Sequence, residues 1–387
     1  MISQAGLQVL DRHQAKYPRH SGQIDSIRLY YKERLWHQLS DSLLEYVDND
    51  DFASDAGDLI ELYTALIKDT KTRMNPLKYA LLTIHCAREF ADLDAAITFL
   101  KEAENRLKGT SQDAEFLCRI AQAQVKLQLG QHHDSLDILN SVKQSLEMMA
   151  DVDPKVYAHL SKVFAAYYHR KEDYENYYKN SLQYLAYTPT SEIKPQEKRT
   201  LAIQLGMAIL LGKNIYNIME LLDKEILQSL AGTEFEWLSA LLNTLGRGQI
   251  TEFEQAIVHH SDYIARFPTI LKELDQLKQK VRIISLLELL FEVDKDDRSL
   301  RFERIATHCQ VHKSDVELLL MKAMSLQLIK GSIDEVEELV HVDWIMPRYL
   351  GRQHLEIMVR KLVEWEGKME QVIRLVEGQS EELLQNL

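Results

Sequence analysis

Cysteine and histidine are the residues of this 387-residue chain whose spacing most directly tests for metal or nucleophile chemistry. Cys86, Cys118 and Cys309 are odd in number, far apart and inside helical patterns. A disulfide framework needs paired cysteines and structural zinc needs four ligands, so we expect neither and favour a reducing compartment. His308 and His312 flank Cys309, but a predicted turn separates the two histidines and no fourth ligand is evident. We therefore predict no metal site.

Two other segments match nucleotide and calcium motifs only in part. Gly206 and Gly212-Lys213-Asn214 are one residue too far apart for a P-loop, and Asn214 stands where Ser or Thr is needed. A calcium-type start at Asp48 is followed by Phe52 and Ala53 where a ligand and a glycine are required. Metalloprotease and serine-hydrolase motifs are absent from the sequence. We predict no catalytic residue and no cofactor.

The amino-acid composition predicts the class of fold. The chain has 14 Gly and 7 Pro, against roughly 27 and 19 at average usage, so a turn-rich β architecture is disfavoured and a mainly α fold is predicted. Its 59 acidic and 46 basic residues give a net charge of −13, which argues against nucleic-acid binding. No apolar stretch is long enough to span a bilayer, and the N-terminus lacks a secretory signal pattern.

Helical repeats account for the first two thirds of the chain. Short turns at five positions are 39, 41, 41 and 36 residues apart. Two helices and two turns fill about 40 residues, and pairs of this kind stack because one pair cannot bury its apolar face alone. We predict a right-handed α-solenoid of TPR/HEAT-like repeats over residues 1–265. The turn positions are Ala91, Gly130, Lys171, Gly212 and Gly248.

Tyrosines are dense between Tyr157 and Tyr187, where eight occur. We favour packing between helices, with hydroxyls left wet, over a ligand-binding aromatic groove. The prolines at 189 and 195 interrupt the helical pattern, so a new helix should begin near Pro195.

A winged-helix pattern follows over residues 266–350. We expect a long helix over 269–293, a short strand at Ser299–Phe302, a short helix over 303–309 and a second helix over 315–328 that opens with a Ser314–Glu317 capping box. Alternation in 329–334 and 340–345 predicts a two-stranded wing. If the preceding repeats are included, the module covers about 175–346.

The second helix of this pattern offers little for reading DNA. Its first two turns contain one Lys against one Asp and one Glu, and residues 296–348 hold ten acidic and seven basic side chains. A wing also has an exposed strand edge that can pair with a strand of another chain. We favour that use, and keep nucleic-acid binding as the alternative.

The last segment, 351–387, predicts an amphipathic helix that joins a bundle. Seven apolar residues are spaced alternately three and four apart, which is the a/d seam of a heptad repeat. Gly378 fits the position just after a helix end. Folding back onto the chain's own solenoid is the alternative to a partner helix. The seam residues are Leu355, Met358, Leu362, Trp365, Met369, Val372 and Val376.

With these features, the sequence resembles the PCI-domain family. The strings 317–334 and 342–350 are similar to PCI subunits of the proteasome lid, and the lid deubiquitinase's metal pattern is missing. The resemblance implies a non-catalytic scaffold whose winged helices share a sheet and whose C-terminal helices gather in a bundle. It makes the wing a partner-facing strand. The wing residues are Ile329, Lys330, Gly331, Ser332, Ile333, Asp334, Val342 and Trp344.

The resemblance also implies partners and location. It predicts a hetero-oligomer of the 26S proteasome regulatory particle that supports ubiquitin-dependent degradation, in cytoplasm and nucleus. Its partners would be other PCI subunits and the metalloprotease-fold subunits of the lid, without nucleic acid or membrane. The COP9 signalosome and the translation initiation factor 3 complex are the alternatives within the family. A free helical-repeat adaptor is the alternative outside it.

Overall fold

The protein is described by a computed structural model that covers residues 4–48, 57–67, 73–149, 151–222, 224–292, 299–346 and 352–385. Its contacts divide the chain into two compact units, 1–192 and 193–387, which we describe separately. The domain boundaries expected from the sequence, after residues 265 and 350, remain predictions. The part of the calcium-type segment from 49 onwards lies outside the described residues.

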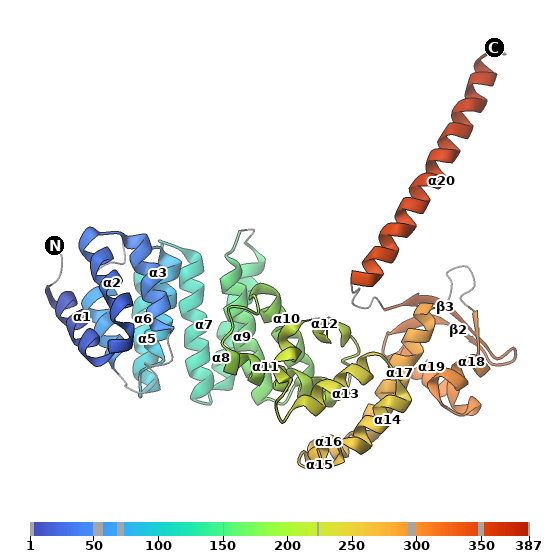
Figure 1. The fold of residues 1–387 in the computed structure, drawn as a ribbon, viewed down its shortest axis with the longest axis horizontal. Coiled ribbons are helices and arrows are strands. Elements are labelled where there is room, and N and C mark those ends of the chain that lie inside the picture. The colour runs from blue at the N-terminus through green and yellow to red at the C-terminus, as the bar shows by residue number, and fades with distance from the viewer. Residues whose placement is uncertain are drawn as a thin grey trace. The chain divides into compact units, whose positions relative to one another are not determined.

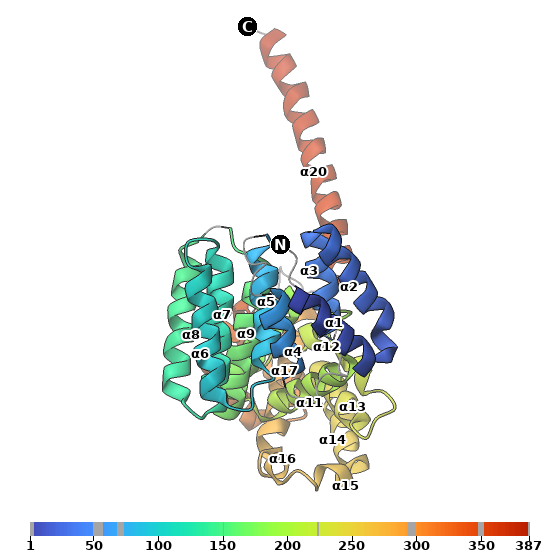
Figure 2. The ribbon, with the colours of Figure 1, turned by 90° about the vertical axis from the view of Figure 1, so that its left-hand side faces the viewer.

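The first unit is built from helices stacked in sequence order (Figure 1). Helix α5 packs against α7, and α7 packs against α9 (Figure 2). Each of these three helices also packs against the helix that follows it, α6, α8 or α10 (Figure 1). The predicted helical-repeat fold is confirmed. The elements are α1 Gln4–Lys16, η1 Pro18–His20, α2 Ser21–Glu33, α3 Trp36–Val47, α4 Asp58–Leu62, η3 Tyr63–Ile67, α5 Pro76–Ala87, α6 Leu93–Leu107, α7 Gln112–Gln128, α8 His132–Glu147, α9 Pro154–Arg170 and α10 Tyr174–Tyr187.

Local sequence sets where these helices begin. Asp92, Ser111, Asp153 and Asp173 each accept a hydrogen bond from a backbone N–H in the first turn of the helix that follows. Such caps satisfy donors that have no partner within the helix. The predicted turns at 91, 130 and 171 all lie between consecutive helices of this unit. The short loops therefore hold each pair of helices antiparallel and adjacent.

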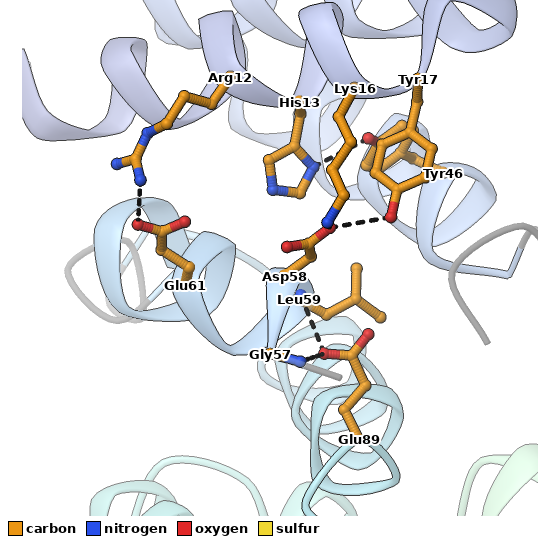
Figure 3. Close-up of polar contacts among 10 residues, drawn as sticks. All are labelled: Arg12, His13, Lys16, Tyr17, Tyr46, Gly57, Asp58, Leu59, Glu61 and Glu89. Carbon is orange, nitrogen blue, oxygen red and sulfur yellow. Dashed lines mark hydrogen bonds and ion pairs between the residues drawn. The ribbon is translucent and has the colours of Figure 1, made fainter. Parts of the chain in front are cut away.

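Polar contacts tie the first helices together around α4 (Figure 3). Lys16 Nζ and Tyr17 Oη donate to Asp58 Oδ2 at 2.7 and 2.8 Å. His13 Nδ1 lies 3.0 Å from Tyr46 Oη, and burial is the main cause that lowers the pKa of His13. Glu89, after α5, accepts from the backbone N–H of Leu59 at 3.0 Å and so caps α4 from outside. The cluster links α1, α3, α4 and the end of α5.

The tyrosine-rich segment packs largely between helices. Tyr167, Tyr177 and Tyr178 are buried, and the rings of Tyr157 and Tyr187 stack with centroids 5.4 Å apart. Burial raises the pKa of Tyr177 to about 12. These rings fill the space between α9 and α10, the most closely associated pair of the unit.

The second unit opens with α11, which begins at Pro195 as expected. The predicted helix over 269–293 is two helices, because Glu273, with φ −99° and ψ 8°, leaves helical geometry between α16 and α17. The elements before the sheet are α11 Pro195–Leu211, α12 Met219–Leu222, η4 Glu225–Leu230, α13 Glu236–Gly246, α14 Ile250–His259, α15 Ser261–Ile264, α16 Pro268–Lys272 and α17 Leu274–Glu292.

Helix α17 is the centre onto which this unit packs. Buried Lys280 donates from Nζ to the carbonyls of Ile209 and Gly212 at 2.6 and 2.8 Å, which closes the C-terminus of α11. Gly248 has φ +66°, and a Cβ there would lie 2.8 Å from the backbone of Ser285. The turn after α13 therefore needs glycine both for its conformation and for its approach to α17.

A small winged helix completes the fold. Strand β1 (Ser299–Arg301) is followed by α18 (Phe302–Cys309), η5 (Lys313–Asp315), α19 (Val316–Ser325), β2 (Ile329–Asp334) and β3 (Leu339–Ile345). The sheet has the order β1-β3-β2 and is antiparallel throughout. This is the predicted helix, turn, helix and two-stranded wing.

Two expected helix ends are wrong. No side-chain capping bond of Ser314 opens α19; instead Ser314 N donates to His312 Nδ1, so a turn and η5 precede the helix. Gly378 does not end the last helix, because α20 runs over Arg352–Gln385. A glycine inside a long helix costs about 1 kcal/mol relative to Ala, which neighbouring turns can absorb.

Candidate partner-binding surfaces

The wing presents one strand edge of the sheet. Since β3 lies between β1 and β2, β2 has a single strand neighbour within the described sheet. Ile329 pairs with Ile345, and Asp334 pairs with Leu339. The outer N–H and C=O groups of β2 face away from β3 and form the kind of edge that accepts a strand of another chain.

The predicted wing residues separate into two faces. Ile329 and Val342 are buried against the helices, so their side chains contribute to the core and only their backbone can take part in an interface. Lys330 and Trp344 pair across the strands on the solvent face, with Lys330 Nζ 5.0 Å from the Trp344 ring centroid. Trp344 remains 38% exposed. A large amphipathic ring beside a cation is typical of residues that anchor protein interfaces.

Gly331 shapes this edge. The register shifts between Lys330 and Gly331, which is a β-bulge. A Cβ at Gly331 would lie 2.0 Å from the carbonyl oxygen of His341 on β3, so no other residue fits without moving the backbone. At the far end, Asp334 Oδ1 accepts from the backbone N–H of Val336 and Glu337 at 3.0 Å and closes the turn. Ser332 is exposed and Ile333 half-buried on the same strand.

Helix α19 carries an apolar pair that sequence reasoning did not assign to a surface. Val316, Leu320 and Ala323 face the core, while Leu318 and Met321 are 69% and 54% exposed. The signal was present in the sequence: with the core face at i, i+4 and i+7, positions 318 and 321 fall on the opposite side. Two exposed apolar side chains on the helix before the wing extend the candidate surface.

The seam of α20 lies fully at the surface. All seven predicted seam side chains are exposed, by between 43% and 62%. Val359, Val363 and Ile373 are exposed beside them and widen the stripe. Exposure of such a stripe to water is unfavourable, because burying one aliphatic or aromatic side chain of this size contributes about 1.5–3 kcal/mol relative to leaving it exposed. The described seam side chains of α20 therefore form an exposed apolar stripe along the helix.

The cysteine and histidine side chains near the wing lie in different environments. Cys309 is buried, and burial raises the pKa of its thiol to about 12, whereas His308 and His312 are exposed. The three do not converge on one point. Within the described ranges, no group of three His, Cys, Asp or Glu side chains is arranged to hold a metal. No described helix is long and apolar enough to cross a membrane.

Comparison with known proteins matches both parts of the chain. Residues 23–242 match the model for PSD13 N-terminal repeats, and residues 258–344 match the PCI domain. The chain is 33% identical over 385 residues to 26S proteasome non-ATPase regulatory subunit 13 homolog B of Arabidopsis thaliana, covering 98% of this chain and 99% of that protein. It is 32% identical over 387 residues to 26S proteasome non-ATPase regulatory subunit 13 of Dictyostelium discoideum, covering 99% and 100%. It is 28% identical over 365 residues to 26S proteasome regulatory subunit RPN9 of Saccharomyces cerevisiae, covering 92% of each.

Proposed function

Because the chain belongs to the PCI-domain family of 26S proteasome non-ATPase regulatory subunit 13, we propose that it is a scaffold subunit of the lid of the 26S proteasome regulatory particle. It has no catalytic part in the particle. It holds other subunits in place and thereby supports ubiquitin-dependent protein degradation. The match over nearly the whole of both chains, rather than over the PCI domain alone, favours this particle over sister PCI assemblies.

The observation that carries the proposal is the exposed seam of α20. The helix has 34 residues, which at 1.5 Å per residue is about 51 Å long. A seam with alternating spacings of three and four matches helices that pack side by side with knobs in holes. The stripe widened by Val359, Val363 and Ile373 offers room for more than one neighbour. A bundle of C-terminal helices from several subunits would bury it.

The wing supplies the second contact. The edge of β2 offers backbone hydrogen bonds, and Lys330 with Trp344 offers side-chain contacts on the exposed face. The exposed pair on α19, Leu318 and Met321, adds apolar area. Strand addition supplies affinity through the main chain, while neighbouring side chains supply selectivity. A winged helix of a neighbouring PCI subunit fits this surface.

The partners in this proposal are other PCI subunits and the metalloprotease-fold subunits of the lid. The chain works in a hetero-oligomer, in cytoplasm and nucleus, and binds neither nucleic acid nor membrane. Its net charge of −13 supports protein partners over nucleic acid.

Affinity purification tests the assignment. The full chain carries a tag at its N-terminus, which leaves α20 unmodified, and co-purifying chains are identified by mass spectrometry. We expect proteasome regulatory subunits in stoichiometric amounts. Recovery of signalosome subunits or of translation initiation factor 3 subunits in their place would assign the chain to a sister assembly. A monodisperse monomer with no partner would favour a free helical-repeat adaptor.

A further inference from the structure

Helix α18 divides its side chains between the core and the surface. Phe302, Ile305 and Cys309 are buried, at the spacing of three and four residues that marks one face of a helix. Four exposed residues occupy the opposite face, and a spacing of four places two of them, Arg304 and His308, one above the other. The four exposed residues are Glu303, Arg304, Thr307 and His308.

An open hollow lies against this exposed face. It has a volume of about 500 Å³ and is lined by the four exposed residues of α18, by Arg301 at the end of β1 and by Leu289 of α17. Leu289 is buried and forms an apolar floor, whereas the other lining residues are exposed. Sites for small molecules enclose most of the ligand. A hollow with so exposed a rim suits a segment of a larger partner.

The rim of the hollow carries more basic than acidic groups. Arg301, Arg304 and His308 stand against a single carboxylate, that of Glu303. Among the described residues, none of the three basic side chains forms an ion pair or a side-chain hydrogen bond. Their N–H groups are therefore available to an acceptor from outside the chain.

The other basic side chains of the winged helix are engaged. In residues 299–346, each of them contacts a neighbouring side chain. These contacts join Lys313 to Glu338, Lys322 to Gln279, Lys330 to Trp344, His312 to Ser314 and His341 to Ser299. Positive charge without a counterion among the described residues of the winged helix is thus concentrated at Arg301 and Arg304.

We propose that this hollow binds an acidic segment of a partner protein, whose carboxylates are held by Arg301 and Arg304. A guanidinium can bind a carboxylate through two parallel N–H···O bonds, which makes arginine selective for planar oxygen pairs. His308 donates a further hydrogen bond, and Leu289 contacts the methylene groups of the bound side chains.

A protein segment fits these observations better than a nucleic acid. Residues 296–348 hold ten acidic and seven basic side chains, and Glu303 stands in the rim itself. A continuous row of phosphates would meet repulsion from these carboxylates. A peptide can instead place its carboxylates at the two arginines and keep them away from Glu303.

The hollow is distinct from the surfaces used in the proposed assembly. Strand β1 forms the edge of the sheet opposite β2, so a segment bound at Arg301 leaves the outer edge of β2 open. The seam of α20 contributes no residue to the hollow. The inference therefore holds whichever assembly the chain joins.

Fluorescence anisotropy with the full chain tests the inference. The probe is a fluorescein-labelled peptide, Gly-Glu-Asp-Leu-Glu-Asp-Gly, and its comparison has Gln and Asn in place of Glu and Asp. We expect saturable binding of the acidic peptide that weakens with added salt, and at least about tenfold weaker binding of the neutral one. Arg301→Gln with Arg304→Gln should weaken binding of the acidic peptide at least about tenfold.

Two further variants distinguish local recognition from overall charge. Arg247→Gln with Arg266→Gln makes the same change in net charge at exposed arginines outside the hollow and should leave the affinity unchanged. Glu303→Gln should tighten binding about two- to fivefold, because an exposed repulsive charge is removed. Circular dichroism establishes that each variant is folded.

Three results would overturn the inference. They are the absence of saturable binding by the unaltered chain, equal weakening by the two arginine pairs, and a failure of Glu303→Gln to tighten binding. Tighter binding of a single-stranded oligouridine than of the peptide, lost in the Arg301 and Arg304 variant, would replace the acidic segment with a nucleic acid.

Discussion

Helices α7 and α20 both have regularly spaced apolar residues, but these residues are buried in α7 and exposed in α20. In α7 the apolar positions are buried on all sides by α5, α6, α8 and α9, and Leu117 has no exposed surface. In α20 every seam side chain remains exposed, although the seam is as regular as any stripe in the repeats. The spacing of apolar residues therefore indicates that one face of a helix can be buried, and only the structure shows whether the same chain buries it.

This difference separates stability from assembly. The repeats are stabilised by burial within one chain, so damage to them should unfold the protein. The seam gains nothing in the isolated chain, so damage to it should leave the fold intact and remove partners. Four measurements test this contrast, and they follow in descending order of expected effect.

The largest effect is expected in the interior of the repeats. Leu117→Ala removes a fully buried side chain from α7 and should lower the free energy of unfolding by about 2–5 kcal/mol, because it loses transfer free energy and leaves a cavity. Leu362→Ala in α20 should change it by less than about 0.5 kcal/mol, as exposed substitutions do. Urea unfolding of the isolated chain measures both. Similar losses would show that α20 folds back on its own chain.

The second effect concerns assembly. Leu362→Glu with Trp365→Glu places two charges in the seam and should weaken co-purification of partners on the order of 100-fold, because each carboxylate would have to be buried unpaired. The isolated variant should keep its helicity by circular dichroism. Quantitative mass spectrometry of tagged complexes measures the loss.

A control variant on the opposite face of α20 has the same change in net charge. Arg360→Gln with Gln371→Glu alters positions that lie about half a turn from the seam. It should retain all partners. If both variants assemble normally, the seam is not an interface and the contrast with α7 does not hold.

The third effect depends on pH, because the repeats contain a titratable group and the seam does not. Folding lowers the pKa of His159 from 6.5 to about 4. The folded state then binds fewer protons than the unfolded state, so stability is complete above pH 6.5 and falls as the pH drops towards 4. The free energy of unfolding of the unaltered protein should fall by roughly 1–2 kcal/mol between pH 7 and pH 5 because of His159, and His159→Gln should abolish this part of the decrease. Urea unfolding at both pH values measures it, and an unchanged pH dependence would contradict it.

The smallest effects distinguish two glycines. Gly331→Ala should lower the free energy of unfolding by about 1–2 kcal/mol, because its Cβ meets the His341 carbonyl. An added Cβ at Gly367 has no atom within 4 Å. Gly367→Ala should therefore stabilise the helical state of α20 by up to about 1 kcal/mol. Hydrogen exchange of β2 and of α20 reports each change. Faster exchange in both would mean that α20 needs flexibility at Gly367.

Much of the fold follows from local sequence. Glycines at 130 and 248 mark two of the turns predicted from the repeat spacing, and in the structure both have positive φ, +83° and +66°, where short loops return the chain. The wing was found because apolar and polar residues alternate with period two. Local signals of this kind do not depend on distant residues.

Features that depend on distant partners were missed. Lys280 closes a helix that ends near Ile209, and Gly331 is fixed by a carbonyl on the next strand. The apparent capping box at Ser314 failed because His312 offers a competing acceptor. The wing residues themselves were correctly grouped on one hairpin, but only the structure separates buried Ile329 and Val342 from exposed Lys330 and Trp344. Which of the exposed surfaces bind partners stays a prediction.

The β-bulge at Lys330 and Gly331 also bears on the period between synthesis and assembly. A flat strand edge invites copies of the same chain to add without limit and to precipitate, whereas a bulge and outward charges such as Lys330 and Asp334 make such growth unfavourable. A neighbour that docks here must carry a strand whose register accommodates the offset. The unbound chain is thereby protected at the wing, and its aggregation risk is concentrated in α20, the segment with most to gain from chaperoning.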